Sequence, residues 1–293
     1  MPDSPSPIVS LAQRLRQPGL VVAPGVFDMV SLRLADSFGF DALYMTGFGT
    51  VASHLGLPDA GIATYTDMVQ RVRAMASMAR APLIADGDTG YGGLLNVAHT
   101  VRGYEAAGAA AIQLEDQEFP KKCGHTPGRR VVPMADMVRK IRVACEARSG
   151  SDFLIIARTD ARTSLGLDEA LRRAEAYAEA GADVLFVESP ESVAEMEKIG
   201  RSTHLPLVAN MVEGGRTPVL SRQELEALGY RIAIFPVTSL LAATHAMREA
   251  YAQIRAQGSS TGTPVPLMPF TELTTLMGFE EVWAFDRRHA ETT

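Results

Sequence analysis

Short apolar runs alternate with longer amphipathic segments along the chain. The runs are rich in Val, Ile and Leu and too short to be buried helices, which is typical of strands covered on both faces of a parallel sheet. They lie at 20–25, 41–47, 82–88, 110–116, 153–159, 183–189, 206–211 and 230–236. Between them, the apolar spacing predicts helices over 94–108, 133–148, 167–180 and 221–228. Ser221 stands three residues before Glu224, which is a capping-box pattern for the last helix.

A weak internal repeat favours a barrel. A helix end, a glycine and then a strand recur as FGFDALYM, AGAAAIQL, AGADVLFV and LGYRIAIF, with the glycine at the left-handed position of a helix C-cap. Eight strand–helix units without a low-complexity linker predict an α/β fold, a (β/α)8 TIM barrel. A doubly wound open sheet is the alternative layout. The segment after the first strand, APGVFD (23–28), is not the glycine-rich phosphate loop of such sheets.

The composition narrows the class of protein. The 293 residues are 46% hydrophobic and 21% charged, and the net charge of −6 argues against a nucleic-acid partner. No run of about 18 apolar residues predicts a membrane span, and the N-terminus has no apolar core of a secretory signal. Two cysteines, Cys123 and Cys145, cannot form a disulfide framework, so we expect a cytoplasmic protein.

The C-terminal region is separated from the predicted barrel. Residues 258–269 are rich in Gly, Ser and Pro, and an amphipathic segment follows over 270–285. We therefore expect a catalytic barrel over 1–258, and a linker with a C-terminal helix over 259–293. From the residues alone, this helix covers either its own barrel or a neighbouring subunit.

Polar residues stand where the predicted strands end, which is where a TIM barrel places its active site. They are Gly25, Thr46, Asp86, Asp88, Glu115, Asp116, Arg158, Asp160, Glu188, Asn210 and Pro236. Taken singly, Asp116 or Asp160 is readily explained as a helix cap or a rim ion pair. So many charges at the ends of apolar strands instead predict a functional site, because buried charges must be paired or ligate a metal.

Three of these carboxylates suggest a metal site. Asp86, Asp88 and Glu115 follow neighbouring strands, and hard oxygen ligands without His or Cys favour Mg²⁺ or Mn²⁺ over zinc. Because Mg²⁺ keeps several waters, one direct ligand and two water-mediated ligands are expected. A carboxylate pair that cleaves saccharides is the alternative, but it leaves the third acid and Arg158 unexplained.

The segment EDQEFPKKCGH (115–125) contains a candidate acid. Cys123 follows Lys121 and Lys122, and nearby cations lower the pKa of a thiol until it exchanges a proton near neutrality. The other cysteine, Cys145, lies on a predicted helix and is interpreted as a small hydrophobic residue. No serine elbow for nucleophilic catalysis is present.

Motifs along most of the chain resemble those of the isocitrate lyase/phosphoenolpyruvate mutase superfamily. They are APGVFD (23–28), YMTG (44–47), GLPDAG (56–61), ADGDTGYGG (85–93), LEDQ and PKKCGH (114–125), ARTDAR (157–162), ES (188–189) and NMVEGG (210–215). The KKCGH motif is typical of the carbon–carbon lyases of that superfamily, and the length resembles that of 2-methylisocitrate and 2,3-dimethylmalate lyases.

The resemblance implies a role for each matching residue. Asp86 would bind Mg²⁺ directly, and Asp88 and Glu115 would bind it through waters. Tyr44, Thr46 and Gly47 would hold the carboxylate of a keto acid. Arg158 would contact the charged oxygens of the substrate, and Glu188 and Asn210 would orient it. Cys123 would be the general acid, with His125 beside it, and Asp59, Lys121 and Gly124 belong to loops that would close over the substrate.

The implied reaction is a Mg²⁺-dependent retro-aldol cleavage, with Mn²⁺ able to substitute. A small 2-hydroxy di- or tricarboxylate, such as 2-methylisocitrate or 2,3-dimethylmalate, would give pyruvate or a similar keto acid. The alternatives are an oxaloacetate hydrolase or decarboxylase, a phosphonate mutase, and a barrel that only binds a dicarboxylate. The resemblance also implies a homotetramer, a dimer of helix-swapped dimers, without nucleic-acid or membrane partners.

The sequence departs from the family pattern at the substrate pocket. Thr46 replaces a common Ser, and NMVEGG (210–215) differs from the segment that holds succinate in isocitrate lyases. Pro236, at the end of the eighth predicted strand, resembles the residue that the lyases have there, whereas oxaloacetate hydrolases tend to have Ser at this position. These departures concern the identity of the product acid more than the type of reaction.

Overall fold

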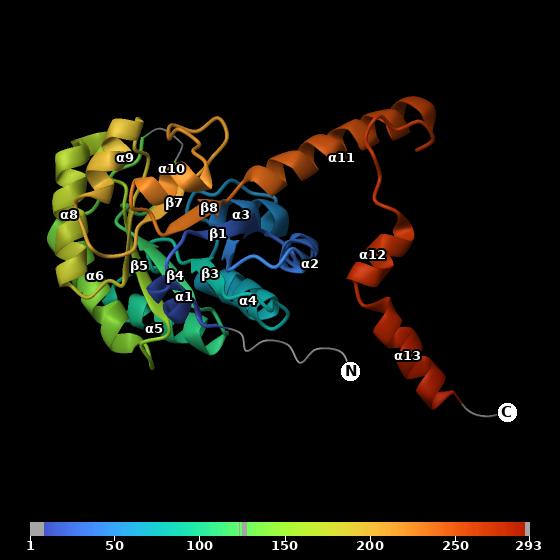
Figure 1. Cartoon of the computed structure of the whole chain (residues 1–293), viewed down its shortest axis with the longest axis horizontal. Coiled ribbons are helices and arrows are strands. Elements are labelled where there is room, and N and C mark those ends of the chain that lie inside the picture. The colour runs from blue at the N-terminus through green and yellow to red at the C-terminus, as the bar shows by residue number, and fades with distance from the viewer. Residues whose placement is uncertain (1–8, 123, 125–127, 291–293) are drawn as a thin grey trace. The chain divides into compact units, whose positions relative to one another are not determined.

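Eight parallel strands form a nearly closed barrel (Figure 1) in the computed structural model, which describes residues 9–122, 124 and 128–290. The strand order is β6-β5-β4-β3-β2-β1-β8-β7, and a parallel bridge between Leu185 and Leu207 joins the two outer strands. The strands are β1 (Val21–Val26), β2 (Leu43–Met45), β3 (Leu83–Asp86), β4 (Ala111–Glu115), β5 (Leu154–Thr159), β6 (Val184–Val187), β7 (Val208–Asn210) and β8 (Ile232–Phe235). The predicted α/β barrel is confirmed.

Helices surround the strands (Figure 1). Those of the barrel are α1 (Leu11–Arg16), α2 (Met29–Ser37), α3 (Gly47–Leu55), α4 (Tyr65–Ala76), α5 (Leu94–Ala106), α6 (Met134–Ala147), α7 (Ala161–Leu165), α8 (Leu167–Glu179), α9 (Val193–Gly200) and α10 (Arg222–Ala227). All four helices predicted from the apolar spacing are present. The Ser221 hydroxyl accepts the Glu224 backbone N–H, as the capping-box pattern predicted.

Two apolar layers hold the barrel together. The larger layer lies between the strands and the helices and includes Leu43, Ile155 and Tyr177. The smaller layer fills the barrel interior and includes residues at the starts of strands together with Leu11 and Leu15 of α1. Helix α1 therefore closes the end of the barrel where the strands begin, so that the site has to lie at the opposite end.

The C-terminal residues form a separate compact unit. Residues up to Ser239 cluster into one unit and residues from Leu240 onward into another, with α11 (Thr238–Gln257) running across the boundary. The prediction of a single amphipathic helix over 270–285 is wrong in one respect. The segment forms two helices, α12 (Phe270–Leu276) and α13 (Phe279–His289), because Gly278 adopts a left-handed φ of 86° between them.

No helix in the described part of the chain is long and apolar enough to span a membrane.

Candidate active site

The ends of β3 and β2 bring Asp86 against Gly47. A Cβ atom on Gly47 would lie only 2.4 Å from Asp86 Oδ2, so this carboxylate position requires a glycine at the start of α3. The other oxygen, Asp86 Oδ1, accepts the backbone N–H of Asp88 at 3.0 Å and lies 3.4 Å from the donor Gln113 Nε2. Asp86 is thus fixed by backbone and by β4, facing the cavity.

Glu115 ends β4 and is only 2% exposed. Its Oε2 lies 3.5 Å from Arg158 Nε, while its Oε1 is buried without a hydrogen-bond partner among the described residues. A buried carboxylate oxygen without a donor is costly unless water or a ligand satisfies it. Glu115 therefore has one oxygen to offer to a group that is not part of the protein.

Lys121 bridges two carboxylates at the edge of this cluster. Its ammonium lies 2.5 Å from Asp59 Oδ1 and 2.6 Å from Asp88 Oδ1, and all three side chains are buried. Burial opposes its protonation, but the surrounding carboxylates, Asp88 foremost, raise the pKa of Lys121 well above its usual value. Lys121 is therefore a fixed positive charge that ties the segment after β4 to the loop of Asp59.

Burial dominates the acidity of the three candidate metal ligands. It raises the pKa of Asp86, raises the pKa of Asp88 to about 7, and raises the pKa of Glu115 well above its usual value. Lys121 lowers all three pKa values, and Arg158 lowers those of Asp86 and Glu115, without cancelling the effect of burial. A divalent cation would relieve this excess of buried negative charge.

The arrangement fits a hydrated cation better than a closed protein cage. Within residues 9–122, 124 and 128–290, no three His, Cys, Asp or Glu side chains are placed to ligate one ion together. Mg²⁺ is often bound through one direct ligand and several waters, so the three carboxylates remain candidates for such a site. The unsatisfied Glu115 Oε1 is a suitable acceptor for such a water.

Arg158, on β5, lies among three carboxylates. Its Nε and Nη2 each lie 2.9 Å from an oxygen of Asp160, and its Nη2 lies 3.4 Å from Glu188 Oε2. Its guanidinium also stacks over the Phe186 ring at 5.1 Å. A Cβ on Gly124 would lie 2.3 Å from Arg158 Nη2, so only glycine lets this loop approach the guanidinium so closely.

Glu188 lies between neighbouring strand ends. Asn210, which ends β7, donates through Nδ2 to Glu188 Oε2 at 3.0 Å. The Ser189 hydroxyl lies 2.9 Å from Glu188 Oε1 and 3.2 Å from the Gly124 carbonyl oxygen. The predicted residues Arg158, Glu188, Asn210 and Gly124 are therefore brought together.

Tyr44 and Thr46 lie on the β2 side of the cavity. The Tyr44 hydroxyl donates to Gln113 Oε1 at 2.9 Å, and burial raises its pKa well above the usual value, so it remains a protonated donor. Thr46 precedes α3, and its side chain makes no cap bond to the helix. First-turn N–H groups of a helix have no intrahelical partner, so this helix start is suited to an anionic group.

One cavity connects these groups, and its lining residues are of two kinds, which we name the polar wall and the apolar wall. The polar wall consists of Tyr44, Thr46, Asp59, Asp86, Glu115, Lys121, Lys122, Gly124, Arg158 and Asn210. The apolar wall consists of Phe48, Val212, Ile234, Pro236 and Val237. Asp88 and Glu188 contact polar-wall residues directly.

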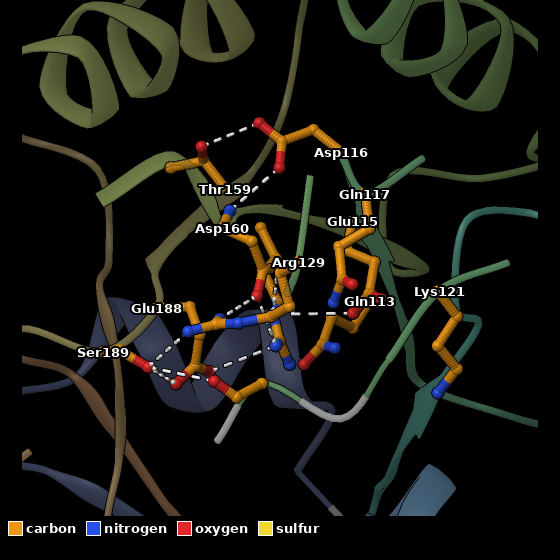
Figure 2. A network of polar contacts seen from close by, with 12 residues as sticks. Gln113, Glu115, Asp116, Gln117, Lys121, Arg129, Thr159, Asp160, Glu188 and Ser189 are labelled. Carbon is orange, nitrogen blue, oxygen red and sulfur yellow. Dashed lines mark hydrogen bonds and ion pairs between the residues drawn. The ribbon is translucent and has the colours of Figure 1, made fainter. Parts of the chain in front are cut away.

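Asp116 and Asp160 differ from their simplest sequence interpretation. Asp160 is fully buried and makes no side-chain cap bond to α7, and it pairs with Arg158 and Arg129. Asp116, also fully buried, accepts the Thr159 hydroxyl at 2.7 Å and the Asp160 backbone N–H at 2.8 Å (Figure 2). Both carboxylates belong to a buried network behind the active site, so the cap and rim-pair interpretations are wrong.

Sequence reasoning missed Gln113, Arg129 and Ser189. Gln113 follows an apolar pattern inside a strand, and Arg129 lies in a loop between two predicted elements, so neither has a local signal. Ser189 has a φ of 60°, which no pattern of residue types reveals.

Two predicted residues, Cys123 and His125, lie outside the described residues. Cys145 is half-buried on α6, with its Sγ 3.1 Å from the Gly181 carbonyl oxygen, and burial raises the pKa of its thiol. A raised thiol pKa fits the expected inert role of Cys145.

Comparison with known proteins identifies relatives over nearly the whole chain. A family model described as phosphoenolpyruvate phosphomutase matches residues 11–255. The 2,3-dimethylmalate lyase of Eubacterium barkeri is 49% identical over 92% of this chain and 94% of its own length. The 2-methylisocitrate lyase of Aeropyrum pernix is 39% identical over 98% of this chain and 91% of its own length. The chain belongs to the isocitrate lyase/phosphoenolpyruvate mutase superfamily.

Solved structures of the superfamily share this fold. A crystal structure of 2,3-dimethylmalate lyase has a TM-score of 0.89 at 40% identity, covering 98% of this chain and 97% of that one. Oxaloacetate acetylhydrolase in complex with 3,3-difluorooxalacetate has a TM-score of 0.90 at 39% identity, covering 95% of each chain. A phosphonopyruvate hydrolase complex with oxalate and Mg²⁺ has a TM-score of 0.82 at 34% identity, covering 93% of this chain and 95% of that one. Within the superfamily, the relatives named lyases identify this chain as a carbon–carbon lyase.

Proposed function

We propose that this lyase cleaves the C2–C3 bond of an alkyl-substituted malate, such as 2,3-dimethylmalate, with 2-methylisocitrate as the related tricarboxylate. The products are pyruvate or a similar keto acid and a carboxylic acid. The observation that carries this proposal is the cavity lining, in which carboxylates for a metal and the Arg158 guanidinium occur together with apolar side chains.

Mg²⁺ is the cofactor we propose, with Mn²⁺ able to substitute. Asp86 would hold the ion directly, and Asp88 and Glu115 would hold it through waters. Glu115 Oε1 supports its part in this, because it is buried and has no hydrogen-bond partner in the described part of the chain. The ion would act as a Lewis acid on the oxygen that becomes the keto group. Hard oxygen donors and a similar protein crystallised with Mg²⁺ support this choice.

The keto-acid half of the substrate would lie at the start of α3. The backbone at Gly47 and the side chain of Thr46 would hold its carboxylate. The protonated Tyr44 hydroxyl would join them by turning its one hydrogen, which it gives to Gln113 Oε1 in the structure, towards the substrate. These donors would hold the forming keto acid in place while the C2 hydroxyl gives up its proton to water, its oxygen becomes the keto oxygen, and the C2–C3 electron pair passes to the leaving fragment.

The leaving fragment would lie between Arg158 and the apolar wall. As the bond breaks, this fragment becomes an enolate-like dianion, which the Arg158 guanidinium would stabilise while Glu188 and Asn210 orient it.

Cys123 would then protonate the carbon of the leaving fragment, with His125 beside it in the same loop. Asp59, Lys121 and Gly124 would fix the loops that exclude water from this carbanion.

The apolar wall favours an alkyl-substituted malate over a tricarboxylate. Val212, Ile234 and Pro236 are buried and suited to methyl groups. A third carboxylate would have to be held by the exposed Lys122, which also lines the cavity, because Lys121 is already paired with two carboxylates and Arg158 with three.

Oxaloacetate hydrolysis is the second candidate, and the similarity to oxaloacetate acetylhydrolase favours it. The same metal site would serve that reaction. Pro236 counts against it, because this residue lines the cavity without a side-chain hydroxyl that would hold a hydrolytic water. A phosphonate mutase is the third candidate, which the KKCGH motif disfavours.

We propose a cytoplasmic homotetramer built from helix-swapped dimers. Supporting this, α12 and α13 carry large apolar side chains that are exposed in the single chain, including Phe270, Phe285 and Trp283. Such a surface is typical of a subunit interface. The C-terminal segment over 259–293 would then pack on a neighbouring subunit.

A substrate panel tests the proposed reaction. Purified protein with Mg²⁺ is incubated with 2,3-dimethylmalate, 2-methylisocitrate, isocitrate, oxaloacetate and phosphonopyruvate, and the keto acid and the second product are identified by mass spectrometry. We expect the highest kcat/KM with 2,3-dimethylmalate. Oxalate and acetate from oxaloacetate as the fastest reaction would instead establish the hydrolase.

A further inference from the structure

Arg129 is a buried arginine behind the active site that the proposed mechanism does not use. It is only 6% exposed, and its Nη1 lies 2.5 Å from Asp160 Oδ1. Its Nη2 donates to Thr163 Oγ1 at 2.7 Å and lies 3.4 Å from Ser189 Oγ. Figure 2 shows Arg129, Asp160, Glu188 and Ser189 gathered in one network. Arg129 is absent from the residues that line the active-site cavity.

The charges around Arg158 explain why a second guanidinium is needed. Asp160, Glu188 and Glu115 all lie within 3.5 Å of Arg158, so one cation faces three buried carboxylates. Alone, Asp160 would neutralise Arg158 and weaken its attraction for an anionic substrate. A carboxylate has enough lone pairs to accept from two guanidinium groups at once.

Asp160 is shared in this way. Its Oδ1 accepts from Arg129 Nη1 and from Arg158 Nη2, while its Oδ2 accepts from Arg158 Nε. Asp160 therefore fixes the orientation of Arg158 with two hydrogen bonds, and Arg129 supplies the charge that balances Asp160. Asp160 thus fixes the position of the Arg158 guanidinium, and Arg129 leaves the positive charge of Arg158 available to an anionic ligand.

We propose that Arg129 is a positioning residue that preserves the positive charge of Arg158 for the anionic substrate by neutralising Asp160. The proposal rests on the proposed function for the role of Arg158 toward substrate. The proposal can be tested without turnover, because the affinity for a small dianion also depends on the positive charge of Arg158. Arg129 acts through Asp160 and Arg158 and does not contact the reacting atoms.

Two substitutions of Arg129 by side chains of similar length separate the effect of its charge from that of its hydrogen bonds. Arg129→Lys keeps the positive charge, whereas Arg129→Gln keeps only a neutral donor. Binding of oxalate in the presence of Mg²⁺ is measured by calorimetry, with melting temperature as the check on folding. Arg130→Gln is the matched control, because Arg130 is the adjacent arginine but is exposed and pairs with the exposed Glu118.

We expect the Kd of oxalate to rise about tenfold in Arg129→Gln, to stay within about threefold in Arg129→Lys, and to be unchanged in Arg130→Gln. With the cleaved substrate, kcat/KM should fall by at least a similar factor in Arg129→Gln, with a loss in kcat as well as a rise in KM, because Arg158 would also stabilise the leaving fragment as it becomes a dianion. An Arg129→Gln protein that binds oxalate as tightly as the wild type would overturn the proposal.

A second comparison applies if Arg129→Gln does not fold. Asp160→Asn removes the carboxylate that Arg129 neutralises, so the double variant with Arg129→Gln buries no unbalanced charge at this position. We expect the double variant and Asp160→Asn alone to bind oxalate equally well. A further tenfold loss in the double variant would contradict the proposal. If the wild type binds oxalate but cleaves no member of the substrate panel, the proposed function fails. The role of Arg129 is then still decided by the oxalate Kd values of the variants.

Discussion

A side chain on Gly47 cannot coexist with the observed position of Asp86. A Cβ at Gly47 would lie 2.4 Å from Asp86 Oδ2 and 3.1 Å from its Cγ, well inside contact distance. The start of α3 and the end of β3 therefore form one unit, in which the helix can approach the candidate metal ligand only because residue 47 is glycine. The helix start that would hold the substrate and the carboxylate that would hold the metal are positioned by the same contact.

Gly47→Ala should therefore disturb the metal site without unfolding the barrel. The new methyl group would displace the Asp86 carboxylate, so we expect the Mg²⁺ concentration for half-maximal activity to rise at least tenfold, equivalent to about 1.4 kcal/mol. Gly93→Ala is the matched control, because a Cβ there meets nothing within 4 Å and its φ is ordinary. Equal Mg²⁺ dependence of the two variants would show that the contact is relieved elsewhere.

Metal removal should abolish turnover. We expect EDTA to stop the reaction and either Mg²⁺ or Mn²⁺ to restore it, because Asp86, Asp88 and Glu115 present only oxygen ligands. Asp86→Ala should reduce activity more than Asp88→Ala, since Asp86 is the proposed direct ligand. The assay is keto-acid release after chelation and metal addition. Full activity in a rigorously metal-free preparation would refute the metal mechanism.

The strand ends could be predicted from the sequence because they depend on short-range patterns. Apolar runs end at Asp86, Glu115, Arg158 and Asn210, and the carboxyl ends of parallel strands in a barrel all meet on one face. This rule placed the main candidate residues together before any contact was known. It needs only the strand boundaries, which the apolar pattern defines well.

The supporting residues could not be predicted in this way. Arg129 contacts Asp160 across 31 residues, and Tyr44 contacts Gln113 across 69, so each pair exists only once the barrel has formed. The break at Gly278 was missed for a different reason. The apolar spacing continues through α12 and α13, and only the left-handed backbone at this glycine separates them.

Mg²⁺ binding should weaken as the pH falls below 7. Burial raises the pKa of Asp88 to about 7, so at lower pH the ion must displace a proton from the site. We expect the apparent Kd of Mg²⁺ to rise by up to about tenfold for each pH unit below 7 and to level off above it. Calorimetry from pH 5.5 to about 8.5 measures this. A Kd that is constant across this range would contradict a protonated cluster.

The stability of the metal-free protein should change with pH in a related way. A carboxyl whose pKa is raised on folding binds more protons in the folded state than in the unfolded state between the two pKa values. The contribution of Asp88 to the free energy of unfolding should therefore be largest at about pH 4 and below, and should fall as the pH rises towards about 7. Saturating Mg²⁺ should reduce this decline, because the cation replaces the proton. Melting temperatures with EDTA and with Mg²⁺ test both statements.

The C-terminal helices should determine the oligomeric state. The large apolar side chains of α12 and α13 are exposed in the single chain, so we expect them to be buried against another subunit. Truncation after Gly258 should shift the protein to a smaller species in light scattering, with the far-ultraviolet circular dichroism of the barrel retained. A truncated protein with the wild-type oligomeric mass would exclude this role for the segment.

Cys123→Ser distinguishes a catalytic thiol from a packed one. General acid catalysis is typically worth about 10²–10⁴-fold, so replacing the proposed acid with a far weaker one should lower kcat by at least about 10²-fold. If Cys123 were only a small packed side chain, the change would cost about 1–2 kcal/mol of stability and leave kcat alone. We expect the melting temperature to change little, because the proposed role of Cys123 is proton donation and not packing.

Cys145→Ser is the matched control for this experiment. Cys145 lies half-buried on α6, and burial raises the pKa of its thiol, so its loss should not change kcat. For the same reason, iodoacetamide should modify Cys123, which follows two lysines, faster than Cys145. Oxalate with Mg²⁺ should slow modification of Cys123, because the loop is expected to close over the bound acid, while modification of Cys145 stays the same. A Cys123→Ser enzyme with more than about a tenth of the wild-type kcat would refute the acid role, because such a loss is smaller than proton donation provides.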